Sequence, residues 1–438
     1  MKFKLEGNGV KPIRSKLKRV MLRLTKVLIL SLAGSVVLTT SSFAQEAPAQ
    51  ANTLTLEDVI KLSLKQNPEL RPYVYKRERS EGLIIQANTG SAKTINVKVE
   101  DVLGSGDLSG LSAMQTSVSI SWLLEQDVID AKVNVAETES LLNQFELETQ
   151  VLDIAADTAK IFVTLLAQQE RLKLAELAKY QAQRVLDKSI KRVEAGQLSI
   201  IDQLRAKAYL AKQSLEVEDY LHEIEATKAQ LSAQWQGDSN FDVVGSLLNI
   251  PSIQQLDTVL EDLKSHPRLK WFATQQRISQ SKQRLAQVSA EPSWSINAGI
   301  KHNESLGDMS FTAGISVPFG AADRNRGKIA ALEAEQAVQQ AQADVWYQQV
   351  STQLLLLTHQ LKHNRHVVEG LTNEVVPALE QASSEAQGVY LKGRYKFGDW
   401  YEVEQELIQS KVELIEAYSN IQLFKIELER LTGASLPK

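Results

Sequence analysis

The sequence predicts an internally duplicated, mainly α-helical chain. Its long coiled-coil helices are expected to form an α-barrel tunnel, and its four β-strands to contribute to a trimeric, 12-stranded membrane barrel. Three observations lead to this prediction. One order of elements occurs twice, each copy contains a very long stretch that favours helix, and a pair of alternating strands precedes each stretch.

The duplication is visible in both the order and the spacing of residues. Each copy, about 200 residues long, opens with a short helical segment that ends before a proline, and later places an aspartate six residues after a glycine. The recurring elements are Asn67-Pro68 and His266-Pro267, Gly196 and Gly393, and Asp202 and Asp399. Order and spacing together predict two repeats, over residues 45–252 and 253–438.

The first 44 residues have the pattern of an export signal. Nine basic residues and one acid precede an apolar run over 27–38, and Ser42-Phe43-Ala44 places small residues at the −3 and −1 positions. This is typical of a secretory signal peptide cleaved before Gln45, with Met21 as an alternative start. The run is shorter than the roughly 20 residues that a membrane-spanning helix needs. We therefore expect residues 1–44 to be removed.

Composition excludes several classes of function. Nine of the 49 basic residues and one of the 53 acidic residues lie in the signal segment, which leaves a net charge of −12 and disfavours a nucleic-acid partner. Without cysteine the chain forms no disulfide and no thiolate metal site. It contains neither Gly-x-Ser-x-Gly nor His-Glu-x-x-His. We therefore predict no catalytic residues, no cofactor and no enzymatic activity.

The helical part of the first repeat is unusually long. No proline occurs between Pro72 and Pro251, and Gly196 is the only glycine between Gln126 and Trp235. Because proline and glycine are the main helix breakers, we expect two helices joined by one turn. The first, over 127–194, is about 100 Å long at 1.5 Å per residue.

Apolar residues at spacings of three and four predict a coiled-coil seam on each of these two helices. The seam residues are Leu152, Ala155, Ala159, Phe162 and Leu166 on the first helix, and Leu204, Ala208, Ala211 and Leu215 on the second. A soluble helical bundle would show the same pattern, so the helices alone do not decide between a bundle and a tunnel.

The strands favour a membrane location. Residues 95–102, 114–124, 294–300 and 309–317 alternate apolar side chains with small polar ones, at lengths close to the roughly 9–11 residues of membrane barrel strands. Four strands do not close a barrel, so we expect three chains to supply twelve. Trp122 and Trp294 are expected at the membrane interface, and residues 103–111 and 302–308 in hairpin loops.

Several segments resemble the outer-membrane efflux protein family, the TolC-like channels. They are LTLEDVIKLSLKQNPEL (54–70), RVEAGQLSIIDQL (192–204) and GRYKFGDWYEVEQEL (393–407). VEDVLGSGDLSG (99–110) and VPFGAADRNRGKI (317–329) are similar to the CzcC-like heavy-metal branch of that family. The resemblance implies a homotrimer in the outer membrane with a long periplasmic helical tunnel. It also implies two partners, a periplasmic adaptor protein and an inner-membrane transporter of the resistance-nodulation-division (RND) type.

The resemblance places function at the two helical turns. The residues expected to form the adaptor-docking tips are Arg192, Gly196, Gln197, Leu198, Ser199, Asp202, Gly393, Arg394 and Tyr395. Ser199 and Asp202 also fit a capping box at the start of the returning helix, which is a purely structural role. Asp399 and Glu402 are expected to form an acidic periplasmic gate, although carboxylates also favour a helix start for electrostatic reasons alone.

Three histidines are weak candidates for a metal site. His359, His363 and His366 are spaced to share one face of a helix, and imidazoles one turn apart are a known ligand arrangement. A hydrated polar helix face explains the same spacing, and we favour that interpretation.

The predicted function is a passive trimeric conduit that exports substrate from the periplasm to the outside of a Gram-negative cell, with heavy-metal cations as the first choice of cargo. A multidrug efflux or type I secretion channel is the alternative within this class. An exported coiled-coil scaffold without a pore is the alternative of another class, and the repeated strand pairs argue against it.

Overall fold

The structure is a computed structural model that describes residues 53–433 except 251, 253, 319 and 321–322. The predicted signal peptide, 1–44, lies outside the described residues. The helices are α1 (Leu56–Gln66), α2 (Arg71–Ala87), α3 (Gln126–Glu194), α4 (Ile200–Ala233), α5 (Leu256–Leu263), α6 (Pro267–Val288), α7 (Arg326–Gly370), α8 (Val376–Leu391) and α9 (Phe397–Thr432), with a π-helical turn over Leu371–Val375 between α7 and α8. The strands are β1 (Thr53–Leu54), β2 (Thr94–Glu100), β3 (Gln115–Leu124), β4 (Asp242–Val243), β5 (Trp294–Asn303) and β6 (Asp308–Ser316).

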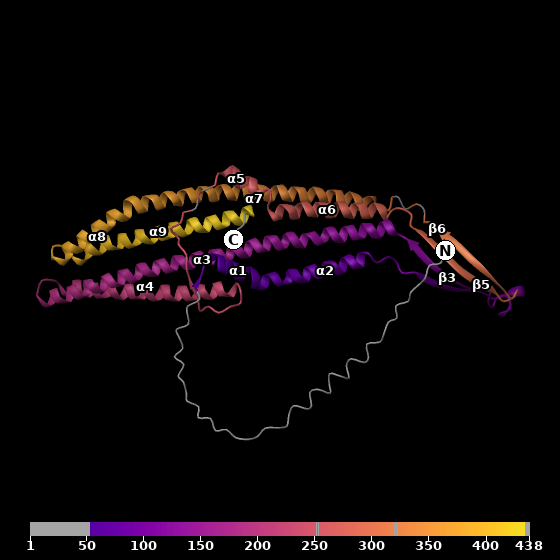
Figure 1. Cartoon of the computed structure of the whole chain (residues 1–438), viewed down its shortest axis with the longest axis horizontal. Helices are drawn as coiled ribbons and strands as arrows, with labels where there is room; N and C mark the ends of the chain where they lie inside the picture. The colour runs from indigo at the N-terminus through magenta and orange to yellow at the C-terminus, as the bar shows by residue number, and fades with distance from the viewer. Residues whose placement is uncertain (1–52, 251, 253, 319, 321–322, 434–438) are drawn as a thin grey trace, which may run out of the picture. The chain divides into compact units, whose positions relative to one another are not determined.

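The helix α3 is the long element that the sequence predicts. It has 69 residues, or about 104 Å at 1.5 Å per residue. Helices α4, α6 and α9 all pack along it, and α3 and α4 lie side by side, as do α8 and α9 (Figure 1). No helix in the described part of the chain is long and apolar enough to cross a membrane.

The predicted seam of α3 is confirmed in the core. Ala155, Ala159, Phe162 and Leu166 are buried, and Leu152 is half-buried. The four buried residues belong to a hydrophobic cluster that also includes buried residues of α1 and α4 and one of α9, Ile426. Small alanine side chains allow these helices to approach closely, as the sequence suggested.

The predicted seam of α4 is wrong for the single chain. Leu204 and Leu215 are 57% and 61% exposed, and Ala208 and Ala211 are also exposed. The buried stripe is instead Ala206, Tyr209, Gln213 and Val217. The helix carries two stripes at similar spacing. Packing against α3, together with the aromatic side chains that α9 places on Tyr209, selects the second one.

Four strands form one antiparallel sheet in the order β2-β3-β5-β6. Strand β2 ends at Glu100, two residues earlier than expected, because Asp101 has φ +53° and turns the chain away. The expected loop 302–308 is also too long, because His302 pairs with Met309 inside the sheet and only 304–307 connect the strands.

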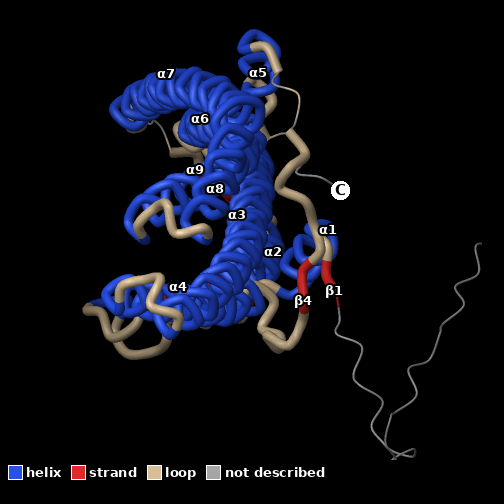
Figure 2. Tube along the Cα trace, turned by 90° about the vertical axis from the view of Figure 1, so that its left-hand side faces the viewer, coloured by secondary structure: helices blue, strands red, loops and turns tan. Residues whose placement is uncertain are grey.

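A second, very small sheet was not expected from the sequence. Strands β1 and β4 pair in parallel, with Thr53 opposite Asp242 and Leu54 opposite Val243 (Figure 2). Leu54 and Val243 are both buried in the same cluster as the α3 seam. The pair thus joins the beginning and the end of the first repeat.

The two repeats have equivalent caps after their first helices: Asn67 caps the 3-10 turn Pro68–Leu70 that leads into α2, and His266 caps α6. The Asn67 side chain accepts a hydrogen bond from the Glu69 backbone N–H (2.9 Å), and His266 Nδ1 accepts one from the Arg268 N–H (3.0 Å). Both cap residues are buried, at 4% and 5% exposure. The two repeats therefore share this capping hydrogen bond, which an amide oxygen accepts in the first and an imidazole nitrogen accepts in the second.

The His266 cap predicts a pH dependence of stability. Burial lowers the pKa of His266 below its ordinary value of 6.5, although the Arg430 backbone and Asp153 oppose this. Because the unfolded chain then binds more protons, the contribution of this residue is full above about pH 6.5 and is lost as the pH falls through the folded-state pKa. We expect the free energy of unfolding to decrease as the pH falls below about 6.5.

The matched control for this pH dependence is His266→Asn, which restores the cap chemistry of Asn67 without a titrating group. Urea unfolding at several pH values measures both proteins. If the decrease in unfolding free energy is as steep in His266→Asn as in the original chain, other groups are responsible.

Candidate functional site

The two helical turns have the same construction. Helix α3 ends at Glu194 and α4 begins at Ile200, while α8 ends at Leu391 and α9 begins at Phe397. Both boundaries recur at the offset of 197 residues seen in the sequence. Each turn passes through a glycine in the left-handed region, where other residues are strained. Gly196 has φ +71° and Gly393 has φ +80°.

The two turns differ in how the returning helix is capped. At the first turn Ser199 Oγ accepts a hydrogen bond from the Ile201 N–H (3.1 Å), which confirms the predicted cap. Among the residues that the structure describes, the Asp202 side chain does not accept a hydrogen bond from the Ser199 backbone N–H, so the predicted capping box is incomplete. At the second turn Lys396 occupies the cap position, and its backbone N–H donates to Asp399 Oδ2 (3.0 Å). Asp399 therefore has a structural role at the helix start.

An aromatic cluster, which we call the tip cluster, lies behind the two turns. It comprises Tyr209, Tyr390, Phe397, Trp400 and Tyr401. Trp400 is 0% exposed, and its ring lies 5.9 Å from that of Tyr390 and 5.7 Å from that of Tyr209. Because Tyr209 comes from α4 and Tyr390 from α8, the cluster joins the two helical hairpins.

Polar contacts reinforce this junction. Ser189 Oγ and the Tyr390 hydroxyl are 2.8 Å apart. The Arg192 guanidinium donates to the Tyr390 carbonyl oxygen through Nη1 (2.8 Å) and to the Gln197 carbonyl oxygen through Nη2 (3.4 Å). A Cβ atom at Gly393 would collide with the same guanidinium. Arg192, predicted only as a docking residue, thus ties one turn to the other.

A buried carboxylate lies near the tip cluster. Glu404 is 2% exposed and accepts a hydrogen bond from Ser383 Oγ (2.5 Å). Burial raises the pKa of Tyr209, and the charge of Glu404 raises it further. Sequence reasoning missed Glu404 because it lies in a run of alternating acids, Glu402, Glu404 and Glu406, of which it alone is buried.

The outer surface of the tips combines polar and apolar side chains. Of the predicted tip and gate residues, Gln197, Ser199, Arg394, Tyr395, Asp399 and Glu402 are exposed, as are both glycines, whereas Leu198 and Asp202 are half-buried. Ile200, Ile201 and Leu204 are also exposed, at 55%, 61% and 57%. The sequence analysis did not name these three as surface residues. The signal that could have indicated this apolar surface is the pair Ile200-Ile201, which directly follows the helix cap Ser199.

Part of the chain matches a known protein family. Residues 59–235 match the family described as outer membrane efflux protein. These residues belong to the outer membrane efflux protein family. The chain is 24% identical over 395 residues to the cobalt-zinc-cadmium resistance protein CzcC of Cupriavidus metallidurans. The aligned region covers 89% of this chain and 92% of CzcC.

Solved structures share the fold of this chain. The outer-membrane channel OprN matches with a TM-score of 0.70 at 15% identity, over 87% of this chain and 90% of its own. CusC matches with a TM-score of 0.69 at 14% identity, over 93% of this chain and 100% of its own. At such identities the likeness concerns the fold alone.

The three histidines that were weak candidates for a metal site lie on the exposed face of a helix, as the favoured interpretation expected. His359, His363 and His366 are all exposed on α7. His366 Nδ1 lies 3.6 Å from a Glu369 carboxylate oxygen. Among the described residues, no group of three or more His, Asp or Glu side chains is placed to hold a metal ion.

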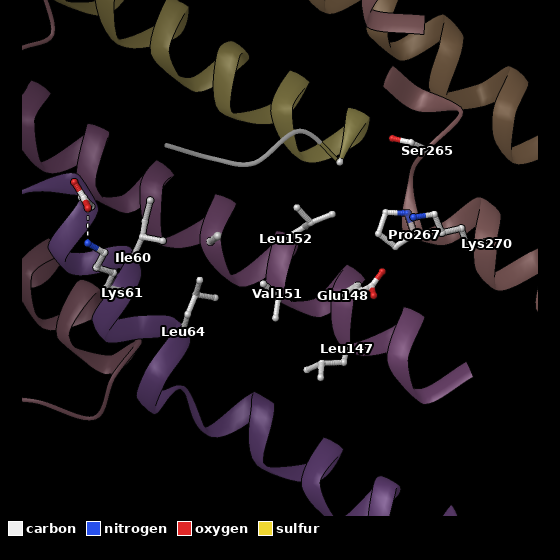
Figure 3. Close-up of a pocket in the computed structure, with 13 residues that line it drawn as sticks. Ile60, Lys61, Leu64, Leu147, Glu148, Val151, Leu152, Ser265, Pro267 and Lys270 are labelled. Atoms are coloured by element: carbon white, nitrogen blue, oxygen red, sulfur yellow. Dashed lines mark hydrogen bonds and ion pairs between the residues drawn. The ribbon is translucent and has the colours of Figure 1, made fainter. Parts of the chain in front are cut away.

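One cavity of the described chain lies far from the tips. It has a volume of about 870 Å³, and its lining is mostly apolar, with Ile60 and Leu64 of α1 facing Val151 and Leu152 of α3 (Figure 3). Ala155 on its wall is about 60 Å along α3 from the end of the helix. It holds no arrangement typical of a catalytic centre, and we assign it no role in transport.

Proposed function

We propose that the chain is the outer-membrane channel of a tripartite, RND-type efflux system. In this proposal three copies form a passive conduit from the periplasm to the outside. The observation that carries the proposal is the four-stranded sheet, which has one apolar and one polar face and continues into helices of exceptional length. The family match of residues 59–235 supports the same assignment.

The register of the sheet supports a membrane location for its apolar face. Ile95, Ile120, Ala298 and Ala313 lie opposite one another across the four strands, and so do Val97, Val118, Ile300 and Phe311. These side chains have no cover within the chain, as the 92% exposure of Phe311 illustrates. A contiguous exposed apolar surface of this kind requires lipid or another protein. We propose outer-membrane lipid.

The open edges of the sheet support a shared barrel. Strands β2 and β6 each have a neighbour on one side only, and unpaired strand edges are not tolerated in lipid. Neighbouring strands alternate in direction, so β6 of one copy can pair antiparallel with β2 of the next. Three copies then supply twelve strands. Trp122 and Trp294 lie on the apolar face, near the end joined to the helices, as expected of interface anchors.

The proposed assembly follows from the two repeats, 45–252 and 253–438. Each contributes one strand pair and one helical hairpin, so three chains place six similar units around one axis. The tips of the hairpins present Gln197, Ser199, Arg394 and Tyr395 at the surface. We propose that this surface, with Ile200, Ile201 and Leu204, docks the periplasmic adaptor that connects the channel to the inner-membrane transporter.

The cargo that we propose is heavy-metal cations. The similarity to CzcC over nearly the whole chain supports this choice. Multidrug efflux or type I secretion is the alternative cargo class for the same channel. A coiled-coil scaffold without a pore does not explain the exposed apolar face of the sheet. Conductance measurements in planar bilayers distinguish the two, because a scaffold should not conduct.

The acidic gate gives the test of this proposal. Asp399→Asn with Glu402→Gln removes two exposed charges per chain and keeps an oxygen acceptor for the Lys396 N–H. If these carboxylates narrow and charge the pore, single-channel conductance rises and block by polyvalent cations weakens. Glu385→Gln, at an exposed acid on the same hairpin, is the control. Unchanged conductance and block in the double variant refute the gate, and a chain that never conducts refutes the channel.

A further inference from the structure

The polar face of the sheet carries charge in only two rows. Across the strands, one row consists of Lys98, Ser117, Lys301 and Ser310, and the next consists of Glu100, Gln115, Asn303 and Asp308. The other polar-face positions of the four strands are uncharged. The two rows lie next to each other at the loop end of the sheet, about 7 Å apart along the strands.

The charges in these rows are not equally compensated. Lys98 Nζ lies 2.5 Å from a Glu100 carboxylate oxygen, so this pair is internally neutral. Lys301 stands between two serines, Ser117 on β3 and Ser310 on β6, and makes no ion pair among the described residues. Asp308 is likewise without an ion pair in the described chain. Beyond the Lys98–Glu100 pair, one positive charge (Lys301) and one negative charge (Asp308) therefore remain on each sheet, although Lys301 also attracts Glu100 at longer range.

We propose that Lys301 is a selectivity-determining residue of the conduit, whose ammonium attracts small inorganic anions to the row that it shares with Ser117 and Ser310. This inference rests on the proposed channel function, which makes the polar face the wall of a water-filled lumen. The site at Lys301 then raises the local concentration of small anions in the outer segment, and three copies repeat it around the pore.

Asp308 opposes this effect from the neighbouring row. The two rows are closer than the Debye length of about 8 Å at physiological ionic strength, so the fields of Lys301 and Asp308 overlap and partly cancel. When either residue is neutralised, the charge of the other is no longer compensated. The two substitutions must therefore change ion selectivity in opposite directions.

The test is the reversal potential of the full-length channel in planar bilayers under a potassium chloride gradient. We expect Lys301→Gln to shift it toward potassium selectivity and Asp308→Asn to shift it toward chloride selectivity. Lys301→Arg keeps the charge and should retain the original value, and so should Lys65→Gln, which alters an exposed lysine of α1.

Each outcome of this experiment has one meaning. Measurements in the Asp399→Asn, Glu402→Gln background ensure that the tips do not dominate the selectivity. Conductance with an unshifted reversal potential in both backgrounds overturns the role of Lys301 and leaves the channel intact. Shifts of the same sign for both substitutions also overturn it. Absence of conductance in the original protein overturns the proposed function instead.

Discussion

Trp400→Ala is expected to release the two helical hairpins from each other at their tips. The indole is fully buried in the tip cluster and contacts aromatic rings from α4, α8 and α9. Removing a buried aromatic side chain costs about 3–5 kcal/mol, through lost contacts and the cavity that remains. Because this junction lies at the end of long helices, the loss is expected locally rather than in global unfolding.

Hydrogen exchange of the backbone amides in the first turns of α9 measures this local stability. Trp400→Phe should show a smaller increase in exchange, and Tyr180→Ala, at an aromatic residue that is 61% exposed on α3, should show none. Equal exchange in Trp400→Ala and the original chain would mean that the tip cluster does not hold the hairpins together.

Arg430→Ala is expected to destabilise the packing of α9 on α3. The guanidinium donates to Asp153 Oδ1 (2.8 Å) on α3 and to Glu427 Oε1 (2.6 Å), and Lys160 of α3 donates to Glu427 Oε2 (2.6 Å). Burial raises the pKa of Glu427, but Arg430 and Lys160 lower it by more, so the carboxylate stays ionised. Losing the charged hydrogen bonds and leaving Glu427 with one partner costs about 3 kcal/mol.

Urea unfolding followed by circular dichroism measures the effect of Arg430→Ala. The control is Arg77→Ala, which removes an exposed ion pair with Glu81 at 3.6 Å and should leave stability unchanged. If the two substitutions have equal effects, the network around Arg430 contributes no more than a surface ion pair.

The sequence predicted the long elements well because their signals are local and repeated. The predicted range of α3, 127–194, differs from the observed helix by one residue, because the helix begins at Gln126. The agreement is close because the segment contains no proline or glycine that could interrupt the helix. The glycines of the two turns are 197 residues apart in the sequence, and both helix boundaries recur at that offset in the structure.

Features that depend on distant partners were not predictable in the same way. The choice between the two stripes of α4 is made by the residues it meets on α3 and α9, which no pattern within α4 encodes. The strands β1 and β4 have two residues each, too few to show an alternating period. The tip cluster depends on Tyr209 meeting Tyr390 and Trp400, which the sequence separates by almost half the chain.

The small parallel pair of β1 and β4 has a consequence for the order of folding. Thr53 and Asp242 are about 190 residues apart, whereas α3 and α4 are joined by a turn of a few residues. Closing the longer loop costs more chain entropy, although the cost grows only slowly with length. We therefore expect the hairpin to form early and the pair to close late, so that β1 acts as a latch that completes the first repeat only after its far end has been synthesised.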